Sequence, residues 1–271
     1  MKFQHIIPIL GLLVAVSARA ATDQHPKLKE KKTYLKLELG ASFSTTARVS
    51  APLTFWDGAT QGYDSDFGTR PLFAAALGYD IVPALTAELS LSYRPHYTYT
   101  KFQTPPDTND SSPGFIGTKT RRFNIDATTL LVSLFLNGRG LAPLRWKSGP
   151  MGSYFYPFVG AGVGISDVTL YNFRSTGLPP NADAFGTTLS FASENEYTKR
   201  YPFTYQVLAG LAYRLLPNWK FEIGYRWLST NRFKGPSFIR DKTGNSADVR
   251  GFEWKQRLSA NELFLNINRY F

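Results

Sequence analysis

The stretch WKFEIGYRWL, residues 219–228, decides the fold because its side chains alternate in character. Every second position is aromatic or aliphatic, and the positions between are charged or small: Trp219, Phe221, Ile223, Tyr225 and Trp227 share one face, and Lys220, Glu222, Gly224 and Arg226 share the other. A period of two is typical of a strand with one apolar face, whereas a helix would scatter the charges among the aromatic residues. The stretch therefore predicts a β-strand.

The same alternation recurs in eight segments separated by polar loops. Two more clear examples are LTAELSLSYRPHYTYT, residues 85–100, and PFTYQVLAGLAYRL, residues 202–215. The predicted strands cover residues 33–43, 71–81, 84–100, 121–136, 153–166, 201–215, 219–229 and 257–271. The fourth is the least regular, and we expect a bulge or a change of facing near Thr128. The pattern predicts an all-β protein.

The connections between these strands alternate in length. The second and third strands are joined by DIVPA, and the sixth and seventh by LLPN, whereas the connections after the first, third, fifth and seventh strands run to about 20 or 30 residues. Long loops on one side and short turns on the other are typical of an up-and-down outer-membrane barrel. The connection at 137–152 is too long for a tight turn, and we expect a surface loop there.

The apolar faces could point outward into lipid, or inward around a ligand as in a soluble lipocalin-type barrel. Aromatic residues concentrate toward both ends of these faces, with aliphatic residues between them, as two membrane interfaces require. They are Tyr79, Tyr213, Trp219 and Phe271 near the short turns, and Tyr97, Tyr99, Tyr201, Tyr225 and Trp227 near the long loops. This distribution favours an eight-stranded antiparallel up-and-down transmembrane β-barrel.

The polar faces of the predicted strands carry equal numbers of basic and acidic residues. The five cations and five acids are Lys36, Arg94, Arg214, Lys220 and Arg226 against Glu38, Glu88, Asp126, Glu222 and Glu262. Buried charges are tolerated only when they are paired and hydrogen-bonded, so such a balance is expected inside a narrow barrel. We predict that these ten residues form an ion-pair network in the lumen.

The last residues, NELFLNINRYF at 261–271, alternate as well and end on an aromatic side chain. An open sheet edge in hydrocarbon leaves backbone groups unsatisfied at a cost of several kcal/mol each. The last strand is therefore expected to pair with the first and close the barrel, with Phe271 at the membrane interface.

The first residues, MKFQHIIPILGLLVAVSARA, combine a basic start, an apolar run of 11 residues and small residues at Ala18 and Ala20. This pattern is typical of a cleaved secretory signal. A membrane anchor helix would need roughly 20 apolar residues. We expect residues 1–20 to be removed, residues 21–32 to form a periplasmic tail and residues 33–271 to form the barrel.

The composition excludes several classes of site. Without cysteine there is no disulfide framework, no thiolate metal site and no cysteine nucleophile. The formal net charge of +11 falls to +9 without Lys2 and Arg19 of the signal, and residues 229–257 hold a local surplus of +4. No single basic groove is visible, and the anions nearest to an exported protein are lipid phosphates, so nucleic-acid binding is not expected.

Three stretches carry a resemblance to a known family. YPFVGAGVGI at 156–165 is similar to the proline-aromatic-V-G-A-G-V-G strand of the small outer-membrane β-barrels, LPNWKFEIGYRW at 216–227 to their turn followed by E-x-G-Y-R, and the closing NELFLNINRYF to their terminal phenylalanine. This group contains the OmpA membrane domain, OmpX, Ail and the opacity proteins. The resemblance implies a Gram-negative outer-membrane protein with extracellular long loops and periplasmic termini. Arg269 departs from the outward aromatic residue usual near such termini, and Tyr270 is the candidate substitute.

No catalytic, cofactor or metal site is expected. Gly160, Gly162 and Gly164 alternate within a strand instead of forming the turn that binds dinucleotides, so we expect them to make room for bulky neighbours. His96 is expected to face the lumen, where a base without an identifiable nucleophile and orienting acid is an incomplete catalytic site. The DTND segment at 107–110 could hold calcium weakly, but a solvated loop is expected.

The long loops are the expected functional part, because rigid barrels carry recognition on their loops. Their aromatic residues are candidate binding residues: Phe55, Trp56, Tyr63, Phe67, Tyr171, Phe173, Phe191, Phe233, Phe238 and Phe252. An eight-stranded barrel is filled by its own side chains, so a structural or adhesive role is expected. The expected partners are outer-membrane lipid, lipopolysaccharide, a host-surface ligand and the barrel assembly machinery, with the barrel itself a monomer. A narrow porin-like channel and a lipid-modifying enzyme are the alternatives.

Overall fold

The computed structural model describes residues 32–45, 49, 61–64, 66–104, 119–147, 153–177, 197–216, 218–240, 246–248, 250 and 253–271. The predicted signal and nearly all of the N-terminal tail lie outside these residues, as do the DTND segment and Phe55, Trp56, Phe191 and Phe252. No helix in the described part of the chain is long and apolar enough to cross a membrane.

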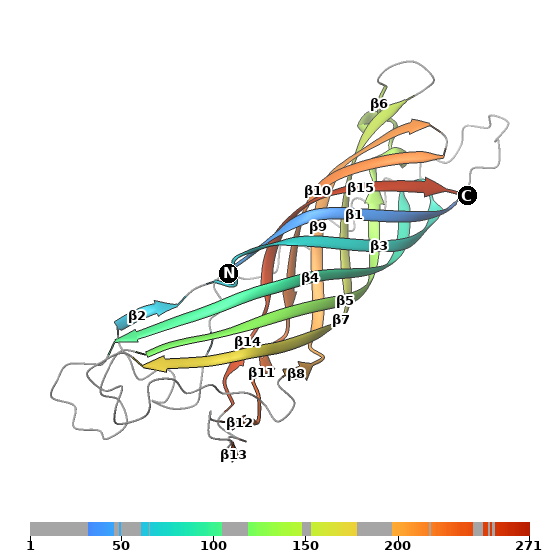
Figure 1. Ribbon diagram of the computed structural model, residues 1–271. Helices are drawn as coiled ribbons and strands as arrows, with labels where there is room; N and C mark the ends of the chain where they lie inside the picture. Colours follow the sequence, from blue (N-terminus) through green and yellow to red (C-terminus); the bar gives the residue numbers. More distant parts are fainter. Residues whose placement is uncertain are drawn as a thin grey trace, which may run out of the picture.

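Eight long antiparallel strands close into a barrel (Figure 1). They are β1 (Thr33–Ser44), β3 (Thr69–Val82), β4 (Leu85–Thr104), β5 (Lys119–Asn137), β7 (Tyr154–Gly177), β9 (Phe203–Leu216), β10 (Trp219–Thr230) and β15 (Ser259–Tyr270). The last strand pairs with the first, from Tyr34 opposite Tyr270 to Ser44 opposite Ala260, and β4 pairs with β5, so the sheet has no open edge. The predicted fold class is confirmed.

Short elements occupy the two ends of the barrel. The long connections contain β2 (Gln61–Asp64), β8 (Tyr197–Arg200), β11 (Phe233–Lys234), β12 (Phe238–Arg240), β13 (Ser246–Asp248) and β14 (Lys255–Gln256). The connection between β5 and β7 contains two 3-10 turns, η1 (Gly138–Gly140) and η2 (Ala142–Leu144), and β6 (Trp146–Lys147). Figure 1 shows β8 and β11–β14 at one end, which we call the loop end, and β6 and the C-terminus at the other, the turn end.

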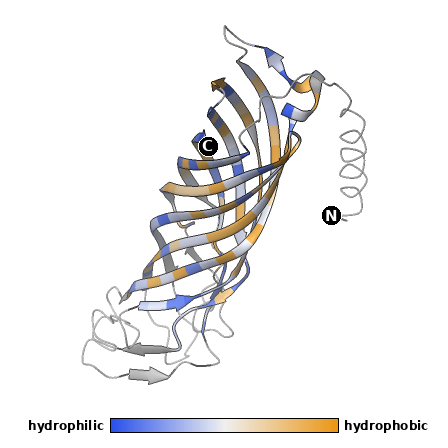
Figure 2. Ribbon diagram, turned by 90° about the vertical axis from the view of Figure 1, so that its right-hand side faces the viewer, coloured by the Kyte–Doolittle hydropathy of each residue, from blue (hydrophilic) through white to orange (hydrophobic). Residues whose placement is uncertain are grey.

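The barrel is apolar outside and polar inside. Leu37, Leu39 and Leu265 are 56, 62 and 62 % exposed on the outer wall, while the charged side chains that alternate with them are buried. Figure 2 shows this alternation as hydrophobic and hydrophilic positions that follow one another along the strands. Such an outer wall is suited to lipid, because a soluble barrel would expose its charges and bury its leucines.

Two β-bulges shift the facing of side chains toward the loop end. The pairing of β4 with β5 shifts between Arg94 and Tyr97, where His96 has a φ of 58°. The pairing of β5 with β7 shifts between Arg122 and Asn124, next to Asn172 of β7, which has a φ of 55°. A bulge adds one residue to a strand and so reverses the alternation that follows it. The bulge expected near Thr128 of β5 is wrong, since the buried positions alternate there without interruption.

The bulge in β4 overturns three predicted orientations. Tyr97 and Tyr99 were expected to face lipid near the loops, but both point inward and are fully buried. His96 was expected to face the lumen, but its side chain is 70 % exposed on the outside. The physical reason is the inserted residue, which places Arg94 and Tyr97 on the same inner face although their sequence spacing puts them on opposite faces.

Candidate functional site

Nine of the ten predicted lumen residues point into the barrel, and each of the nine is at most 7 % exposed. They come from five strands: Lys36 and Glu38 from β1, Glu88 and Arg94 from β4, Arg214 from β9, Lys220, Glu222 and Arg226 from β10, and Glu262 from β15. They are brought together because each lies on the polar side of a strand whose other side is apolar. The exception is Asp126.

In the centre of the lumen, two arginine side chains contact the same carboxylate. Arg94 contacts Glu262 with Nε 2.5 Å from Oε1, and Arg226 approaches the same carboxylate with Nε 2.7 Å from Oε2. Arg226 also pairs with Glu38, and Ser42 donates a hydrogen bond of 2.7 Å to Glu262. Paired and hydrogen-bonded charges of this kind are the form in which ions are tolerated in a protein interior.

A second group of charges lies closer to the turn end. The Lys36 ammonium is 2.5 Å from Glu88 and 3.3 Å from Glu222, and Lys220 is 2.7 Å from Glu222. The hydroxyl of Tyr34 donates a hydrogen bond of 2.9 Å to Glu88. Two lysines and two glutamates therefore neutralise one another across three strands of the barrel.

Aromatic rings cover the cations on the turn-end side. The Lys220 ammonium lies 4.5 Å from the centre of the Tyr34 ring, and the Arg214 guanidinium lies 4.8 Å from the centre of the Tyr270 ring. The two rings are themselves in contact, with centroids 5.1 Å apart. Such cation–π contacts stabilise cations that are withdrawn from water, and the rings narrow this end of the lumen.

Sequence reasoning missed one further lumen pair. Arg139 of η1 donates a hydrogen bond of 2.8 Å to Asp80 at the end of β3, and both side chains are 6 % exposed. Thr86 donates a second hydrogen bond of 2.7 Å to Asp80. The connection at 137–152 is therefore more than the predicted surface loop, because it inserts a cation into the turn end of the barrel. The sequence feature that could have indicated this inserted cation is an arginine, Arg139, between two glycines.

Asp126 was predicted in the lumen, and this prediction is wrong. It belongs to the outward face of β5, where its Oδ1 accepts a hydrogen bond of 2.7 Å from the backbone N–H of His96 and one of 3.1 Å from the Tyr171 hydroxyl. The Tyr93 hydroxyl donates to its other oxygen at 3.3 Å. The inner positions of this part of β5 are the apolar Phe123, Ile125 and Ala127 instead.

The side chain of His96 lies beside the carboxylate of Asp126, a contact that the sequence pattern did not predict. Its Nδ1 lies 3.2 Å from Asp126 and 2.5 Å from the Tyr171 hydroxyl. A histidine oriented by an acid is part of many hydrolytic sites, but a nucleophile within reach of the base is also required. Neither contact supplies a serine, so the group has only part of the chemistry that acyl transfer needs. Among the described residues no group of three His, Asp or Glu side chains could hold a metal ion.

The loop end of the barrel is filled by an apolar cluster. Its fully buried members include Phe67, Tyr97, Tyr99, Phe123, Ile125 and Leu170, and Phe173 and Phe233 are 7 and 5 % exposed. Phe67, Phe173 and Phe233 were candidate binding residues of the loops, and that prediction is wrong for these three, since they pack inside instead of facing a partner. The inner surface therefore changes from charged to apolar between Arg94 and Tyr97.

In the described part of the loop end, several basic residues are exposed close together. Arg232, Lys234, Lys255 and Arg257 are exposed around β11 and β14. Arg200 of β8 ties this region to the neighbouring strand through hydrogen bonds of 3.1 and 2.8 Å to the carbonyls of Lys234 and Gly235. This arrangement gathers cations from the residues before β15 onto one face.

Comparison with protein-family models gives a match over most of the chain. Residues 9–255 match the model of the outer membrane protein beta-barrel domain, which is more than half of the chain. No curated protein matches the sequence.

Solved structures give similarities at low sequence identity. Neisserial surface protein A is 12 % identical, with 88 % of this chain and 97 % of that chain covered and a TM-score of 0.41. OprG from Pseudomonas aeruginosa is 12 % identical, with coverages of 89 and 97 % and a TM-score of 0.42. The outer membrane protease OmpT from Escherichia coli is 11 % identical, with coverages of 92 and 99 % and a TM-score of 0.43. The family assignment depends on the family model.

Proposed function

The chain belongs to the outer membrane β-barrel family and is an integral outer-membrane protein, and from this premise we propose that it is a non-enzymatic barrel with a closed lumen and an adhesive loop end. Its short turns and termini face the periplasm, and its long loops face the exterior. The loop end contacts anionic glycans, either of lipopolysaccharide or of a host surface. The barrel acts as a monomer that the assembly machinery inserts.

The observation that carries the closed lumen is the contact of Arg94 and Arg226 with Glu262. All three side chains are at most 4 % exposed; Arg226 and Glu262 come from the adjacent strands β10 and β15, and Arg94 reaches them across the lumen from β4, three strands away from β15. The apolar cluster around Phe123 lies above them toward the loop end. Both layers support a barrel whose interior is occupied by its own side chains.

Basic residues support the contact with anionic glycans. Lys255 and Arg257 are exposed beside Lys234 and Arg232, and Glu253, an acid that contacts this group, is buried against Lys234 at 3.6 Å. Phosphate and sulfate groups are bound by arginine and lysine clusters of this kind. The outer leaflet supplies lipid phosphates directly beside such residues.

The test of the closed lumen is the conductance of the refolded protein in a planar bilayer. We expect no steady current from protein whose strand content is verified by circular dichroism. A repeatable single-channel conductance would contradict the closed lumen and make the protein a narrow channel.

The test of the loop end is binding to lipopolysaccharide and to heparin. Lys255→Gln with Arg257→Gln is expected to weaken binding by about tenfold or more at low salt, because two phosphate contacts are lost. Lys32→Gln with Arg269→Gln removes two exposed cations from the turn end and is the matched control. Equal binding by both double variants would contradict an adhesive loop end.

A narrow channel is the second candidate, and one feature of the lumen favours it. Glu222 contacts both Lys36 and Lys220, and Glu262 contacts both Arg94 and Arg226. One cation can leave each carboxylate while the other remains, so the pairs can rearrange without leaving an acid unpaired. In a channel, Arg226→Ala or Glu88→Gln would change the conductance, whereas a closed barrel would stay silent in both variants.

A further inference from the structure

The hydrogen-bonded ladder between β3 and β4 is interrupted toward the loop end. It runs from Val82 opposite Leu85 to Phe73 opposite Tyr93 and then stops, although β3 begins at Thr69 and β4 continues to Thr104. Two residues beyond this point each strand contains a proline, Pro71 in β3 and Pro95 in β4, and proline has no N–H to donate to a ladder. Contact resumes where the N–H of Thr98 donates to the carbonyl of Phe67 at 3.2 Å. We call this interruption, residues 70–72 against 94–97, the seam.

Arg70 crosses the barrel wall at the seam. In the register of β1 and β3 it lies opposite Ser42, whose side chain is buried inside the barrel. Its Nη2 nevertheless donates a hydrogen bond of 3.3 Å to Thr98, which belongs to the outward face because its neighbours Tyr97 and Tyr99 point inward. Its Nε is buried, and no described residue accepts a hydrogen bond from it. Most of the five donors of this guanidinium are therefore still available to an anion.

A second arginine lies on the outward face beside the seam. Every second residue of β5 from Phe123 to Leu131 is buried, so Asn124 and Arg122 belong to the outward face, and Arg122 is exposed. Asn124 accepts a hydrogen bond of 3.2 Å from Thr98, the same side chain that Arg70 contacts. The two arginines therefore flank one hydrogen-bonded row that runs across β3, β4 and β5.

The acid that β4 and β5 place on this face is already engaged. Asp126 accepts hydrogen bonds from the backbone N–H of His96 and from the hydroxyls of Tyr171 and Tyr93. These donors hold both of its carboxylate oxygens against the wall, so the two arginines leave a surplus of positive charge beside the seam.

The same outward face is apolar on the other side of Tyr93. Leu91 and Leu130 are opposite one another and are 53 and 44 % exposed, and Tyr93 is 40 % exposed. With a strand rise of about 3.3 Å per residue and a tilt near 40°, Thr98 lies roughly 10 Å nearer the loops than Tyr93. Aliphatic, aromatic and then basic residues follow one another where a barrel passes from hydrocarbon into lipid headgroups. The seam therefore lies at headgroup level.

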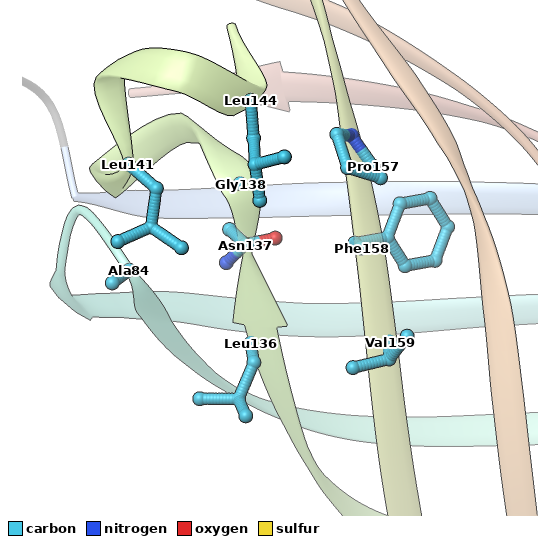
Figure 3. A pocket seen from close by; sticks show the side chains of 9 residues that line it. All are labelled: Ala84, Leu136, Asn137, Gly138, Leu141, Leu144, Pro157, Phe158 and Val159. Carbon is cyan, nitrogen blue, oxygen red and sulfur yellow. The ribbon is translucent and has the colours of Figure 1, made fainter. Parts of the chain in front are cut away.

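The pocket at the turn end has a different character. The connection between β5 and β7 encloses a space of about 170 Å³ whose walls include Leu136, Leu141, Leu144 and Val159 (Figure 3). No charged side chain lines it, so its lining does not select an anion. The seam instead combines cations with an adjoining apolar wall.

We propose that Arg70 and Arg122 bind a phosphate group of a lipid headgroup at the seam. The planar guanidinium matches the oxygens of a phosphate, and the acyl chains would lie on the wall around Leu91 and Leu130, which favours a lipid over a free ion. The identity of the lipid rests on the proposed orientation, which makes it the lipid A of lipopolysaccharide. The site is separate from Lys255 and Arg257, because three strands lie between β4 and β10 in either direction around the barrel.

The experiment is native mass spectrometry of the folded full chain in neutral detergent, titrated with lipid A, which carries the phosphates and acyl chains of lipopolysaccharide without its long glycan. Arg70→Gln and Arg122→Gln are the test variants, and the exposed position of Arg122 keeps its replacement from disturbing the fold. Lys199→Gln is the control, because Lys199 of β8 is 46 % exposed at the loop end and lies away from the seam. Dephosphorylated lipid A and inorganic phosphate are the further arms.

We expect one tightly retained lipid A on the wild type and on Lys199→Gln, and retention about fivefold weaker in Arg70→Gln and in Arg122→Gln. Dephosphorylated lipid A should be retained less than lipid A. Equal retention in Arg122→Gln and Lys199→Gln would overturn the proposal, and so would displacement of lipid A by an equal concentration of inorganic phosphate, which would make the seam a site for free anions. Detergent removes any dependence on orientation, and heparin binding tests Lys255 and Arg257 alone, so either proposal can fail while the other stands.

Discussion

Arg94 and Glu262 form a two-pronged ion pair in the centre of the barrel, with Nε 2.5 Å from Oε1 and Nη2 3.0 Å from Oε2, and neither side chain is exposed to solvent. Parallel contacts between guanidinium and carboxylate are among the strongest polar interactions in proteins. Arg226 uses the same carboxylate, so Glu262 neutralises two cations while each arginine has further partners. The three residues therefore contribute unequally to the stability of the barrel.

Glu262→Gln should be more destabilising than Arg94→Met. Removing Glu262 leaves Arg94 buried without its acid and should lower the free energy of unfolding by about 3–5 kcal/mol. Removing Arg94 leaves Glu262 still paired with Arg226, so the loss should be smaller. The measurement is reversible urea unfolding of the protein in lipid vesicles. Arg94→Met added to Glu262→Gln should restore part of the stability, and strictly additive losses would contradict this account.

The pair of Arg139 and Asp80 predicts a similar effect at the turn end. Arg139→Gln should lower the free energy of unfolding by about 3 kcal/mol, because Asp80 would remain buried with Thr86 as its neighbour and no cation. Asp80→Asn in the same chain should recover most of that loss. Arg145→Gln, in the same connection but exposed, is the control for loss of charge and should leave the unfolding midpoint unchanged.

The barrel and most of its lumen could be predicted because one sequence pattern, the alternation of apolar and polar residues, predicts both the strands and the side chains that point inward. In WKFEIGYRWL the same pattern that makes a strand also assigns Lys220, Glu222 and Arg226 to the inside. The glycines of β7 were also interpreted correctly, since a Cβ on Gly160 would lie 2.8 Å from the Phe135 ring. The strands, the inward charges and the glycine positions depend on the local sequence and on the rule that one face of each strand meets lipid while the other faces the lumen.

The sequence-based predictions were wrong for residues whose orientation is not determined by the alternation of apolar and polar positions. His96, Tyr97 and Tyr99 follow a bulge, whose inserted residue leaves no mark in the hydrophobic pattern. Asp126 was assigned by its polarity, but toward the loop end the barrel buries apolar residues such as Phe123 and Ile125 and leaves polar ones outside, as a soluble protein does. The partnership of Arg139 with Asp80 joins residues that are 59 positions apart, one in the connection after β5 and the other at the end of β3.

Single cysteines provide a direct test of the bulge in β4, because the natural chain contains none. His96→Cys should react rapidly with a water-soluble maleimide, since the His96 side chain is 70 % exposed. Tyr97→Cys should be protected, since Tyr97 is fully buried. A strand without the bulge would give the opposite order of reactivity.

The apolar cluster at the loop end predicts a separately unfolding region. Phe123→Ala removes a buried ring that contacts Phe67, Tyr99 and Trp254, with centroids 6.4, 4.9 and 5.8 Å away, and should cost about 3–5 kcal/mol. This loss of stability should be confined to the loop end, because the charged part of the lumen lies on the other side of Arg94. Limited proteolysis should then cleave the long loops faster, while the membrane-embedded strands stay intact.

Leu130→Ala on the same strand is the control for this prediction. Leu130 is 44 % exposed on the outer wall and contributes to the lipid-facing surface instead of the cluster. Its loss removes apolar area without opening a cavity in the loop end, so the rate of loop cleavage should match that of the wild type. Faster cleavage in both variants would mean that the loop end and the membrane-embedded barrel unfold as one unit, and the apolar cluster would then be an extension of the barrel core with no independent stability.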